Sequence, residues 1–511
     1  MTDWTAGYVA DIGYTFGYYT ELNPHRLRLA FLNAGLEFPE VADACELGFG
    51  QGLSANIHAA ASQTRWFGTD FNPSQAQFAQ TLGKVSGADA RFFDQSFEEF
   101  CSRSDLPDFD YIGLHGIWSW VSDRNRTVIV DFIRRKLKVG GVLYISYNTQ
   151  PGWAAMTPMR DLLTEHSEVM GVRGQGIVSR IDGALAFAEK MLATNPVYAR
   201  ANPQVAETIQ KIKEQDRHYL AHEYFNRDWL PMPFSRMAEW LAPTKLSFAC
   251  SAFFLDHVEP VNLTDEQVAF LKEIPDGMFR ESVRDFMVNH RFRRDYWVKG
   301  GRRLSPLAHA EALRAEQVVL VKPIADISLK ITSPLGEATL QKEVYDPILE
   351  VLSDYKAKSL RQLEQAVKGK GLVFSRVLQA VMVLAGTGAL EVKQDDAISS
   401  KATKQSEKLN VYLCDKARGS GDVGYLASPV TGGGVLVGRS YQLFMLARMQ
   451  GQKTPAEWAA FAWQVLAAQG QKIVKEGRTL ETSEENLSEL NAQAKTFSEK
   501  HLPLLRELKV V

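Results

Sequence analysis

The sequence has little cysteine, almost no net charge and no long apolar run, and each shortage excludes a class of protein. Its 511 residues include four cysteines without the paired spacing of a zinc site or a disulfide framework: Cys45, Cys101, Cys250 and Cys414. With 58 basic and 60 acidic residues, the formal net charge of −2 gives no electrostatic reason to expect a nucleic acid partner. We expect neither a metal site nor a nucleic acid ligand.

The apolar runs are too short for a membrane span. The longest, Val377 to Leu390, falls short of the roughly 20 residues that a spanning helix needs, and it contains Gln379 and two glycines. The N-terminus, Met1 to Thr5, has no basic segment followed by an apolar core, which argues against a signal peptide. We therefore expect a cytoplasmic protein of two or three domains.

Residues 45 to 52, Cys-Glu-Leu-Gly-Phe-Gly-Gln-Gly, are the most informative segment. Three glycines in eight residues let the backbone fold tightly over the end of a strand and bring its N–H groups against a ligand. A nicotinamide-binding turn has its third glycine three positions after the second, where this chain has Leu53. The segment is therefore a ligand-binding turn of another kind.

Short apolar segments that end in polar residues follow the glycine turn. The first ends at Asp70, roughly 20 residues beyond the glycines, where an acid binds the hydroxyl groups of a ribose. The later ones are Ala90–Gln95, Phe109–Gly116 and Gly140–Asn148, with helical patterns at Ser74–Leu82 and Thr127–Lys138 between them. This alternation predicts an α/β fold with a doubly wound, Rossmann-like parallel sheet and a ligand at the carboxyl ends of its strands.

Composition and pattern divide the chain into five parts. We expect residues 1–153 to form the first part of the sheet domain, 154–227 a helical insertion, 228–300 the last strands, 301–400 a winged-helix-like region and 401–511 a helical C-terminal domain. The third helix of the winged-helix pattern carries one basic residue, Arg376, which favours protein contact over DNA binding. Residues 397–401 are expected to be a loop. The aromatic segment Tyr14–Tyr19 before the sheet is either a packed helix or a lid over the ligand.

The glycine turn and the acids resemble motif I and the following strands of the class I S-adenosylmethionine-dependent methyltransferases. Further segments are similar to the bacterial group with a methyltransferase regulatory domain, which includes outer-membrane-protein lysine methyltransferases; they are His115–Trp120, Ser146–Trp153, His222-Glu223-Tyr224 and Arg291-Phe292-Arg293. The likeness covers roughly residues 1–300. Phe49 and Gln51 stand where the lysine-modifying members often have cysteine or small residues, so the resemblance does not transfer the substrate.

The resemblance implies S-adenosyl-L-methionine as the cofactor. Glu46 would contact its methionine moiety, Asp70 the ribose and Asp94 the adenine amino group. The full set of expected cofactor-binding residues is Glu46, Gly48, Phe49, Gly50, Gly52, Asp70, Phe71, Asp94, Gln95, Ser96 and His115.

The candidate catalytic residues follow the central strands. His115, at the tip of the fourth strand, is placed to act as a base for an alcohol or amine acceptor, and a hydrogen bond to cofactor or backbone is the alternative. Four aromatic residues are candidates for a pocket wall, with ordinary core packing as the alternative for each: Trp118, Trp120, Tyr147 and Trp153. For His222 and Glu223 a capping or interdomain bond is favoured over catalysis.

Three functions stay open at this stage. The first is methyl transfer to a nucleophile on a macromolecule, such as a protein lysine. The second is O-methylation of a glycan or small metabolite, and the third is a cofactor-binding scaffold without catalysis. The acceptor would be a protein, a glycan or a small molecule, and amphipathic helices in 154–227 predict a homodimer.

Overall fold

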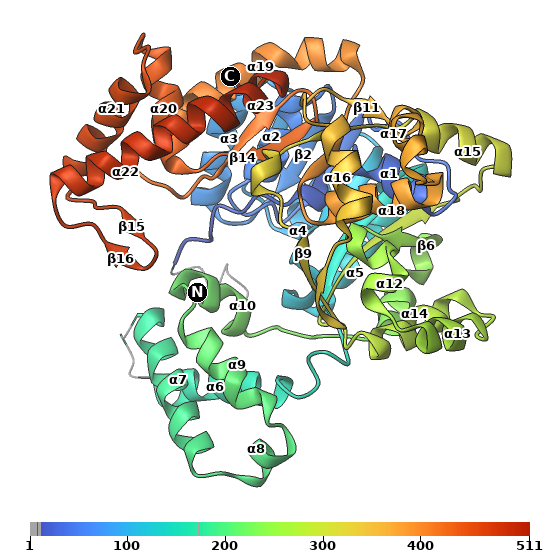
Figure 1. Cartoon of the computed structure of the whole chain (residues 1–511). Helices are drawn as coiled ribbons and strands as arrows, with labels where there is room; N and C mark the ends of the chain where they lie inside the picture. The colour runs from blue at the N-terminus through green and yellow to red at the C-terminus, as the bar shows by residue number, and fades with distance from the viewer. Residues whose placement is uncertain (1–7, 9–11, 172–173, 175) are drawn as a thin grey trace.

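The computed structural model describes residues 8, 12–171, 174 and 176–511. Its centre is a seven-stranded sheet (Figure 1), which confirms the predicted doubly wound α/β fold. In spatial order the strands are β3 (Ala90–Phe93), β2 (Arg65–Thr69), β1 (Asp43–Leu47), β4 (Phe109–Leu114), β5 (Leu137–Asn148), β7 (Phe292–Lys299) and β6 (Leu246–Ser251). Strands β1 to β5 run parallel, and β7 is antiparallel to both of its neighbours.

Helices cover both faces of the sheet, because parallel strands between helices are apolar on both sides. On one face, Phe100, Phe132 and Met237 pack against the strands; they come from α4 (Phe97–Cys101), α5 (Asp123–Lys136) and α11 (Phe234–Leu241). The other face is covered by α1 (Arg26–Asn33), α2 (Leu53–Ala61) and α3 (Pro73–Ser86).

Capping residues set the ends of these helices. Helix α3 begins after Asn72, whose side chain accepts a hydrogen bond from the Ser74 N–H group at 3.0 Å, and it ends at Gly87 with a φ of 70°. Helix α5 begins after Ser122, which caps it in the same way. The capping residues therefore set the ends of these helices, which the apolar periodicity of the sequence does not define.

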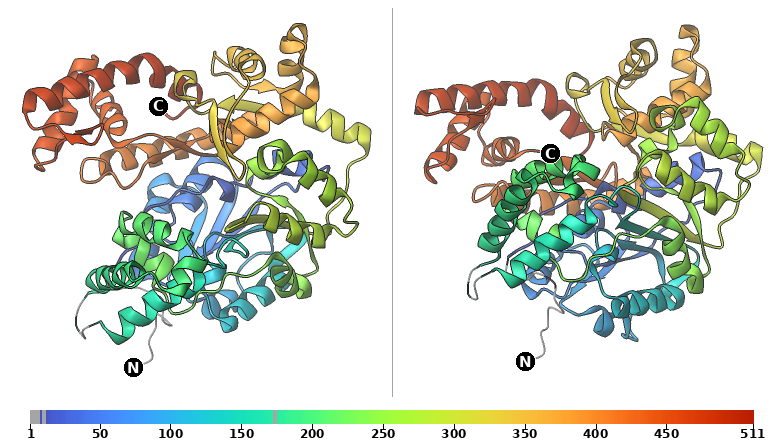
Figure 2. Two further views of the ribbon diagram at one scale, coloured as in Figure 1. Left: turned by 60° about the horizontal axis from the view of Figure 1, so that its bottom comes forward. Right: turned by 90° about the horizontal axis from the view of Figure 1, so that it is seen from below.

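The segment expected as an insertion is helical. It contains α6 (Thr157–Val169), α7 (Ile177–Ala193), α8 (Val197–Ala201), α9 (Gln204–Lys213) and α10 (Arg217–Tyr224). These helices have a core of their own, in which Leu163, Ile181 and Ile209 pack with Trp120 and Trp153. Figure 1 shows this unit below the sheet, and Figure 2 shows it from two further sides.

A second helical unit lies between β6 and β7, where the sequence indicates only strands. It contains α12 (Glu259–Asn262), α13 (Asp265–Lys272) and α14 (Gly277–Met287). Arg293 of β7 is buried and donates to Asp285 at 2.7 Å, to Glu281 at 2.9 Å and to Asp295 at 3.0 Å. This ion-pair network fastens α14 to the sheet.

The chain beyond α15 (Pro306–Ala315) forms two further units. In the first, α16 (Lys342–Val351), α17 (Leu360–Val367) and α18 (Phe374–Gly386) lie with a small antiparallel sheet ordered β11 (Lys358–Ser359), β8 (Gln317–Leu320) and β12 (Leu390–Val392). A hairpin of β9 (Lys330–Ser333) and β10 (Gly336–Thr339) completes it. These elements are of the kind that a winged helix contains.

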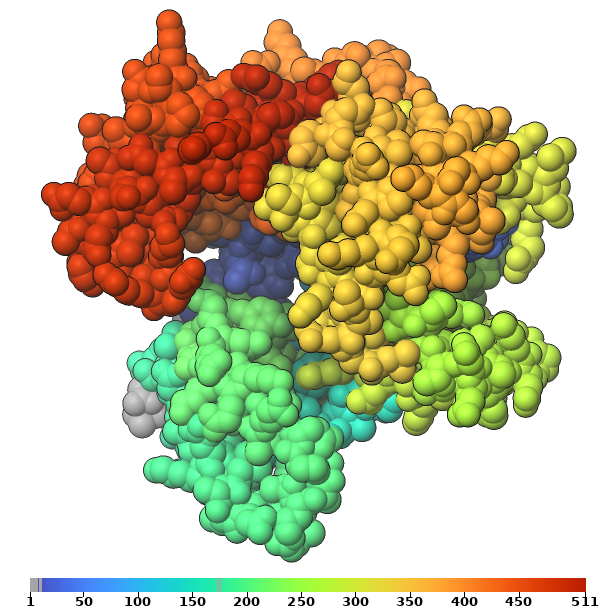
Figure 3. All heavy atoms as spheres, in the orientation of Figure 1, coloured from blue at the N-terminus to red at the C-terminus, as the bar shows by residue number. Residues whose placement is uncertain are grey.

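The last unit is mainly helical. It contains α19 (Asp396–Lys416), the hairpin β13 (Tyr425–Ser428) and β14 (Gly433–Leu436), α20 (Arg439–Met449), α21 (Pro455–Ala467), the hairpin β15 (Val474–Lys475) and β16 (Arg478–Thr479), α22 (Ser483–Thr496) and α23 (Leu502–Glu507). The space-filling view shows a hollow between this unit and the helical insertion, with N-terminal residues at its floor (Figure 3).

The prediction of a loop at residues 397–401 is wrong, because these residues form the first turns of α19. The Asp395 side chain accepts a hydrogen bond from the Ala397 N–H group at 2.8 Å and so caps the helix. Ser400 donates to the Asp396 carbonyl at 2.8 Å, which satisfies its hydroxyl inside the helix.

Across the described ranges, no single helix is long and apolar enough to cross a membrane. Two consecutive segments, Leu360–Lys370 and Phe374–Gly386, are together long and apolar enough by length and composition, but the chain bends by 119° between them.

Helix α2 joins the sheet to the C-terminal units. All nine of its residues are buried, because the sheet covers one side and α19 with the β13–β14 hairpin covers the other. Leu53 and Ile57 belong to the same core as Leu409 and Leu426. A helix that is buried all round needs apolar neighbours on every side, so the C-terminal units complete the packing of the sheet domain.

A buried ion pair crosses the same junction. Arg26 of α1 is 2% exposed and pairs with the carboxylate of Glu391 in β12, which also accepts a hydrogen bond from the Thr20 hydroxyl at 3.1 Å. The Arg26 guanidinium lies 4.2 Å from the centre of the Phe254 ring. Both charges therefore depend on each other for compensation.

We expect Glu391→Leu to destabilise the fold by about 3–5 kcal/mol, because it leaves the Arg26 charge buried without its partner. The double variant Arg26→Met with Glu391→Leu removes both charges and should recover most of that loss. Urea unfolding of the three proteins measures the difference. Equal stability of the two variants would contradict this account of the pair.

Candidate active site

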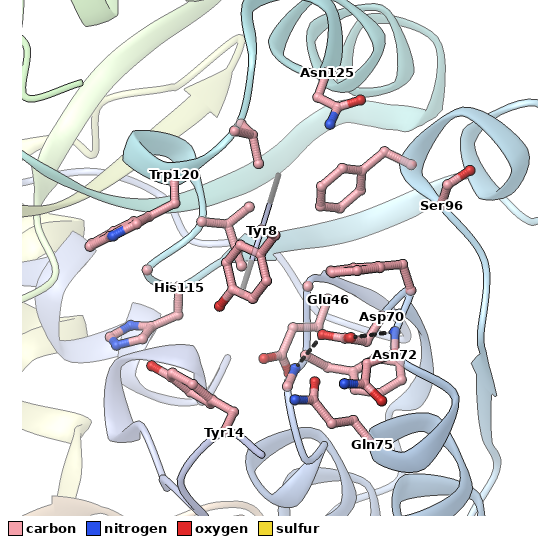
Figure 4. A pocket seen from close by; sticks show the side chains of 18 of the residues that line it. Tyr8, Tyr14, Glu46, Asp70, Asn72, Gln75, Ser96, His115, Trp120 and Asn125 are labelled. Carbon is pink, nitrogen blue, oxygen red and sulfur yellow. Dashed lines mark hydrogen bonds between the residues drawn. The ribbon is translucent and has the colours of Figure 1, made fainter. Parts of the chain in front are cut away.

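A cavity of about 290 Å³ lies at the carboxyl ends of β1, β2 and β4. Sheets of this kind bind their ligands at that edge. Figure 4 shows side chains from the strand ends and from the N-terminal segment around it. The predicted site residues that line it are Glu46, Gly48, Phe49, Gly50, Asp70, Phe71, Gln95, Ser96 and His115.

The glycine turn is shaped by close approaches that only glycine permits. Gly48 has a φ of 74°, and a Cβ atom there would lie 2.4 Å from the Ile117 side chain. Gly52 has a φ of 67°, and a Cβ atom there would lie 2.5 Å from Ala79 of α3. Gly52 does not line the cavity, contrary to its predicted contact with the cofactor; its role is to begin α2.

Two buried acids stand at the centre of the site. The Asp70 carboxylate accepts the Gly50 N–H group at 2.9 Å and the Asn72 N–H group at 3.0 Å, so it fixes the glycine turn as well as facing the cavity. Burial raises the pKa of Asp70 to about 6. Glu46 is 3% exposed, and burial with the nearby Asp70 charge raises its pKa well above the usual range. Its Oε2 atom has no hydrogen-bond partner within the described residues.

The contact of Asp94 with the adenine amino group stays a prediction. Asp94 is exposed and does not line the cavity, whereas Gln95 and Ser96 do. The chain turns immediately after β3, since Ser96 caps α4 through reciprocal hydrogen bonds with Glu99.

His115 lines the cavity, as predicted, and is held by two tyrosines. Its Nδ1 atom shares a hydrogen bond of 2.7 Å with the Tyr144 hydroxyl, and its ring stacks on Tyr19 with centroids 3.8 Å apart. Burial lowers the pKa of His115 to about 4, against the smaller opposing effect of Glu21. The imidazole is therefore uncharged at neutral pH.

Trp118 and Tyr147, the other candidate catalytic residues, do not line the cavity. The Trp118 indole is buried in the core and donates to the Met232 sulfur at 3.3 Å. Tyr147 is also buried and donates to Asp295 at 2.9 Å. Both belong to the core on the far side of the sheet from Tyr144, because side chains alternate along β5.

Four aromatic side chains form one wall of the cavity, and Tyr8 is the one among them that the sequence analysis does not single out. Tyr8, Tyr14, Tyr19 and Trp120 line it. The aromatic segment Tyr14–Tyr19 before the sheet was the signal for this wall. Of the two interpretations of that segment, a packed helix or a lid, the lid describes Tyr14 and Tyr19. Tyr18 points away from the site: its hydroxyl accepts the Gly434 N–H group at 2.6 Å in the C-terminal unit.

Helix α10 holds this N-terminal segment over the cavity. His222 donates to the Ile12 carbonyl at 3.0 Å, and His218 bonds to the Gly13 carbonyl at the same distance. The His222 ring also lies 5.4 Å from the Tyr8 ring and 5.1 Å from the Tyr14 ring. The expected interdomain role of His222 is therefore a link between α10 and the segment that closes the site.

Comparison with known proteins agrees with this geometry. Residues 216–299 match the family described as a predicted methyltransferase regulatory domain. An uncharacterized protein of Synechocystis sp. is 42% identical over 510 residues, which cover 99% of both chains. The chain belongs to the family of that protein. An uncharacterized protein of Rickettsia prowazekii is 29% identical over 288 residues, 54% of this chain and 49% of its own.

Solved structures agree on the fold. The structure of PKMT2 from Rickettsia typhi in complex with AdoHcy aligns with a TM-score of 0.69 over 97% of this chain and 99% of the other, at 16% identity. A second structure of PKMT2 from Rickettsia typhi aligns with a TM-score of 0.67 over 98% of this chain and 99% of the other. The predicted methyltransferase fold is confirmed by this likeness, and the match of residues 216–299 agrees with the predicted regulatory region.

The residues of the cavity fit the predicted cofactor, S-adenosylmethionine. The unpartnered Oε2 atom of Glu46 and the carboxylate of Asp70 accept hydrogen bonds from ammonium and hydroxyl groups, which the cofactor carries at its methionine and ribose ends. Phe49, Phe71 and Phe97 supply apolar surface for a flat base.

We expect Asp70→Ala to weaken S-adenosylmethionine binding by about 1.5–3 kcal/mol, because it removes a charged hydrogen-bond acceptor for the ribose and releases the glycine turn. Asp94→Ala is the matched control and should bind as the unaltered protein does. Calorimetry on both variants measures the effect. A larger loss in Asp94→Ala than in Asp70→Ala would reverse the assignment of the two acids.

Proposed function

We propose that this methyltransferase methylates an amine nitrogen on a macromolecule, and that the acceptor is the side chain of a protein lysine. The observation behind the proposal is the state of His115. Its pKa is lowered to about 4 by burial, and Tyr144 already occupies its Nδ1 atom. So weak a base gives little help in removing a proton from a hydroxyl group. A lysine amine loses its proton to water before it reacts, at a reference pKa of about 10.4.

The chain's own residues would align the acceptor and keep water out. When bound, S-adenosylmethionine supplies a methyl group already activated on a sulfonium, so the protein chiefly has to orient the acceptor. Glu46 and Asp70 would hold the polar ends of the cofactor. Tyr14 and Trp120 close the cavity beside His115, and their π faces favour a cationic ligand over a neutral one.

The test is to incubate the protein with methyl-labelled cofactor and fractionated cell extract, and then to hydrolyse the labelled protein to amino acids. We expect the label in methylated lysine. Label in polysaccharide or small molecules would instead establish O-methylation, and a protein that binds the cofactor but transfers no label would be a scaffold.

The variant His115→Asn tests the base directly. For an amine acceptor we expect cofactor affinity to stay unchanged and methyl transfer to recover as pH rises towards the pKa of the amine, since the neutral fraction grows without a base. Initial rates from pH 7 to 10 measure this. A loss of roughly 10²–10⁴-fold that persists at every pH would indicate a required base and hence a hydroxyl acceptor.

We place the protein in the cytoplasm. Its four cysteines are all free and buried, which suits a reducing compartment.

We also propose a homodimer formed through the helical insertion. Large apolar side chains are exposed on its packed helices α6 and α7, with Val169 at 71%, Met170 at 68% and Phe187 at 40% exposure. Apolar surface gathered in one unit is typical of an interface between identical chains.

Light scattering should give about twice the chain mass of 57.2 kDa at micromolar concentration. The variant Phe187→Asp should shift the mass towards one chain, because it introduces a charge into the interface. Phe286→Asp on α14, also exposed, is the control and should leave the dimer intact. A mass of one chain for the unaltered protein would refute the dimer.

A further inference from the structure

One acid of the cavity wall comes from the segment between α10 and α11. Asp228 of that segment lines the cavity, as Trp120 and Ser122 do. The Leu230 N–H group donates to the Ser119 carbonyl at 2.8 Å, which holds the segment beside the turn that carries Trp120. The backbone therefore fixes an acid and an aromatic ring of the same wall to each other.

The neighbours of Asp228 hold its backbone in place. The Trp229 side chain is 9% exposed and packs in the core of the helical insertion, with its ring 5.0 Å from the Trp153 ring. Further along, the Met232 N–H group donates to the Asn148 carbonyl at the end of β5, at 3.1 Å. The Asp228 side chain itself remains 37% exposed, so solvent and a ligand can both reach it at the cavity wall.

The other acids of this wall are engaged. Two of them lie at the glycine turn, where the cofactor is expected. The third, Glu98, forms an ion pair with Arg124 at 2.6 Å. The ion pair of Asp228 within the described residues is longer, with 3.5 Å between its Oδ2 atom and the Nη2 atom of its exposed neighbour Arg227. Exposed pairs of that kind contribute little, so a ligand cation can take the place of Arg227.

A second cation near Asp228 is already occupied. The Arg126 guanidinium donates to the Asp123 carboxylate at 2.6 Å and, through two of its nitrogens, to the Trp118 carbonyl at 3.1 Å. Its hydrogen bonds therefore go to partners other than Asp228, and the carboxylate at the cavity keeps acceptor positions for a ligand.

The chemistry of this part of the wall defines that ligand. An ammonium group bonds to a carboxylate and is attracted to an aromatic face, whereas a neutral hydroxyl gains little from either. Asp228 supplies the carboxylate and Trp120 the aromatic face. In Figure 4 Trp120 stands with His115 on one side of the cavity, away from Asp70 and Asn72. The ligand that fits is the side chain of lysine or another primary alkylamine, whose aliphatic stem packs on apolar ring surface.

We propose that Asp228 binds the ammonium group of the acceptor where the acceptor enters the cavity. The inference rests on the proposed amine acceptor and adds the residue that selects it. The bond forms while the amine carries its proton; once that proton is lost to water, the neutral amine moves on to the methyl group, and Asp228 takes no part in the transfer. The region matched as regulatory, residues 216–299, thereby supplies the acid that recognises the acceptor.

The experiment uses n-butylammonium chloride as the probe, with 1-butanol as its neutral counterpart. Ligand-observed NMR at neutral pH follows the binding of each to the full chain saturated with S-adenosylhomocysteine. We expect the unaltered protein to prefer butylammonium, and Asp228→Asn to weaken that binding about threefold to tenfold, because it removes a charge-assisted bond at a partly exposed site. Asp228→Glu should restore part of the affinity.

Two controls separate this effect from damage to the fold and from a general loss of negative charge. Asp228→Asn should keep the affinity for S-adenosylhomocysteine and for 1-butanol. Asp161 of α6 is the matched acid, because it also pairs with a neighbouring arginine, Arg160, at 3.4 Å, but does not line the cavity. Asp161→Asn should therefore bind butylammonium as the unaltered protein does.

Equal butylammonium affinity in Asp228→Asn and the unaltered protein would overturn the inference. A matching loss of S-adenosylhomocysteine affinity would also overturn it, since Asp228 would then serve the cofactor. Both results are distinguishable from failure of the proposed function, which the labelling of extract with unaltered protein decides. Label in lysine together with an unaffected Asp228→Asn variant would reject Asp228 alone, whereas label in hydroxyl groups would reject the amine acceptor itself.

Discussion

The burial of helix α2 on every side is the constraint on which the rest of the structure depends. The helix begins at the end of the glycine turn, so whatever holds α2 also holds the backbone that faces the cofactor. Its inner side needs the sheet and its outer side needs α19 and the β13–β14 hairpin. The C-terminal half therefore supports the cofactor site by packing, although none of its residues lines the cavity.

The N-terminal segment uses the same junction to shape the site. Tyr18 reaches the C-terminal hairpin, where it contacts Tyr425 and Gly434, while its neighbour Tyr19 stacks on His115 in the cavity. Because adjacent side chains of an extended chain point to opposite sides, one short segment joins the far unit to the candidate active site. Helix α10 fixes the same segment from the opposite side.

The cavity gathers acids in a place where burial makes their charge costly. Glu46 and Asp70 both have raised pKa values, and burial is the main cause in each case. Both line the end of the cavity next to the glycine turn. Such a distribution suits a ligand that is positively charged at more than one point, and it leaves an anionic ligand without a favourable position.

The sequence by itself determined the sheet and the cofactor end of the site, because those features depend on short-range geometry. Gly48 and Gly50 have positive φ angles in the turn between β1 and α2, and Asp70 bonds to that turn from the end of the next strand, β2; the spacing in the sequence reflects this βαβ arrangement. Only the tertiary structure decided the acceptor side. Trp118 and Trp120 share a turn of three residues, yet one lies in the core and the other in the cavity, since packing against distant segments sets their directions.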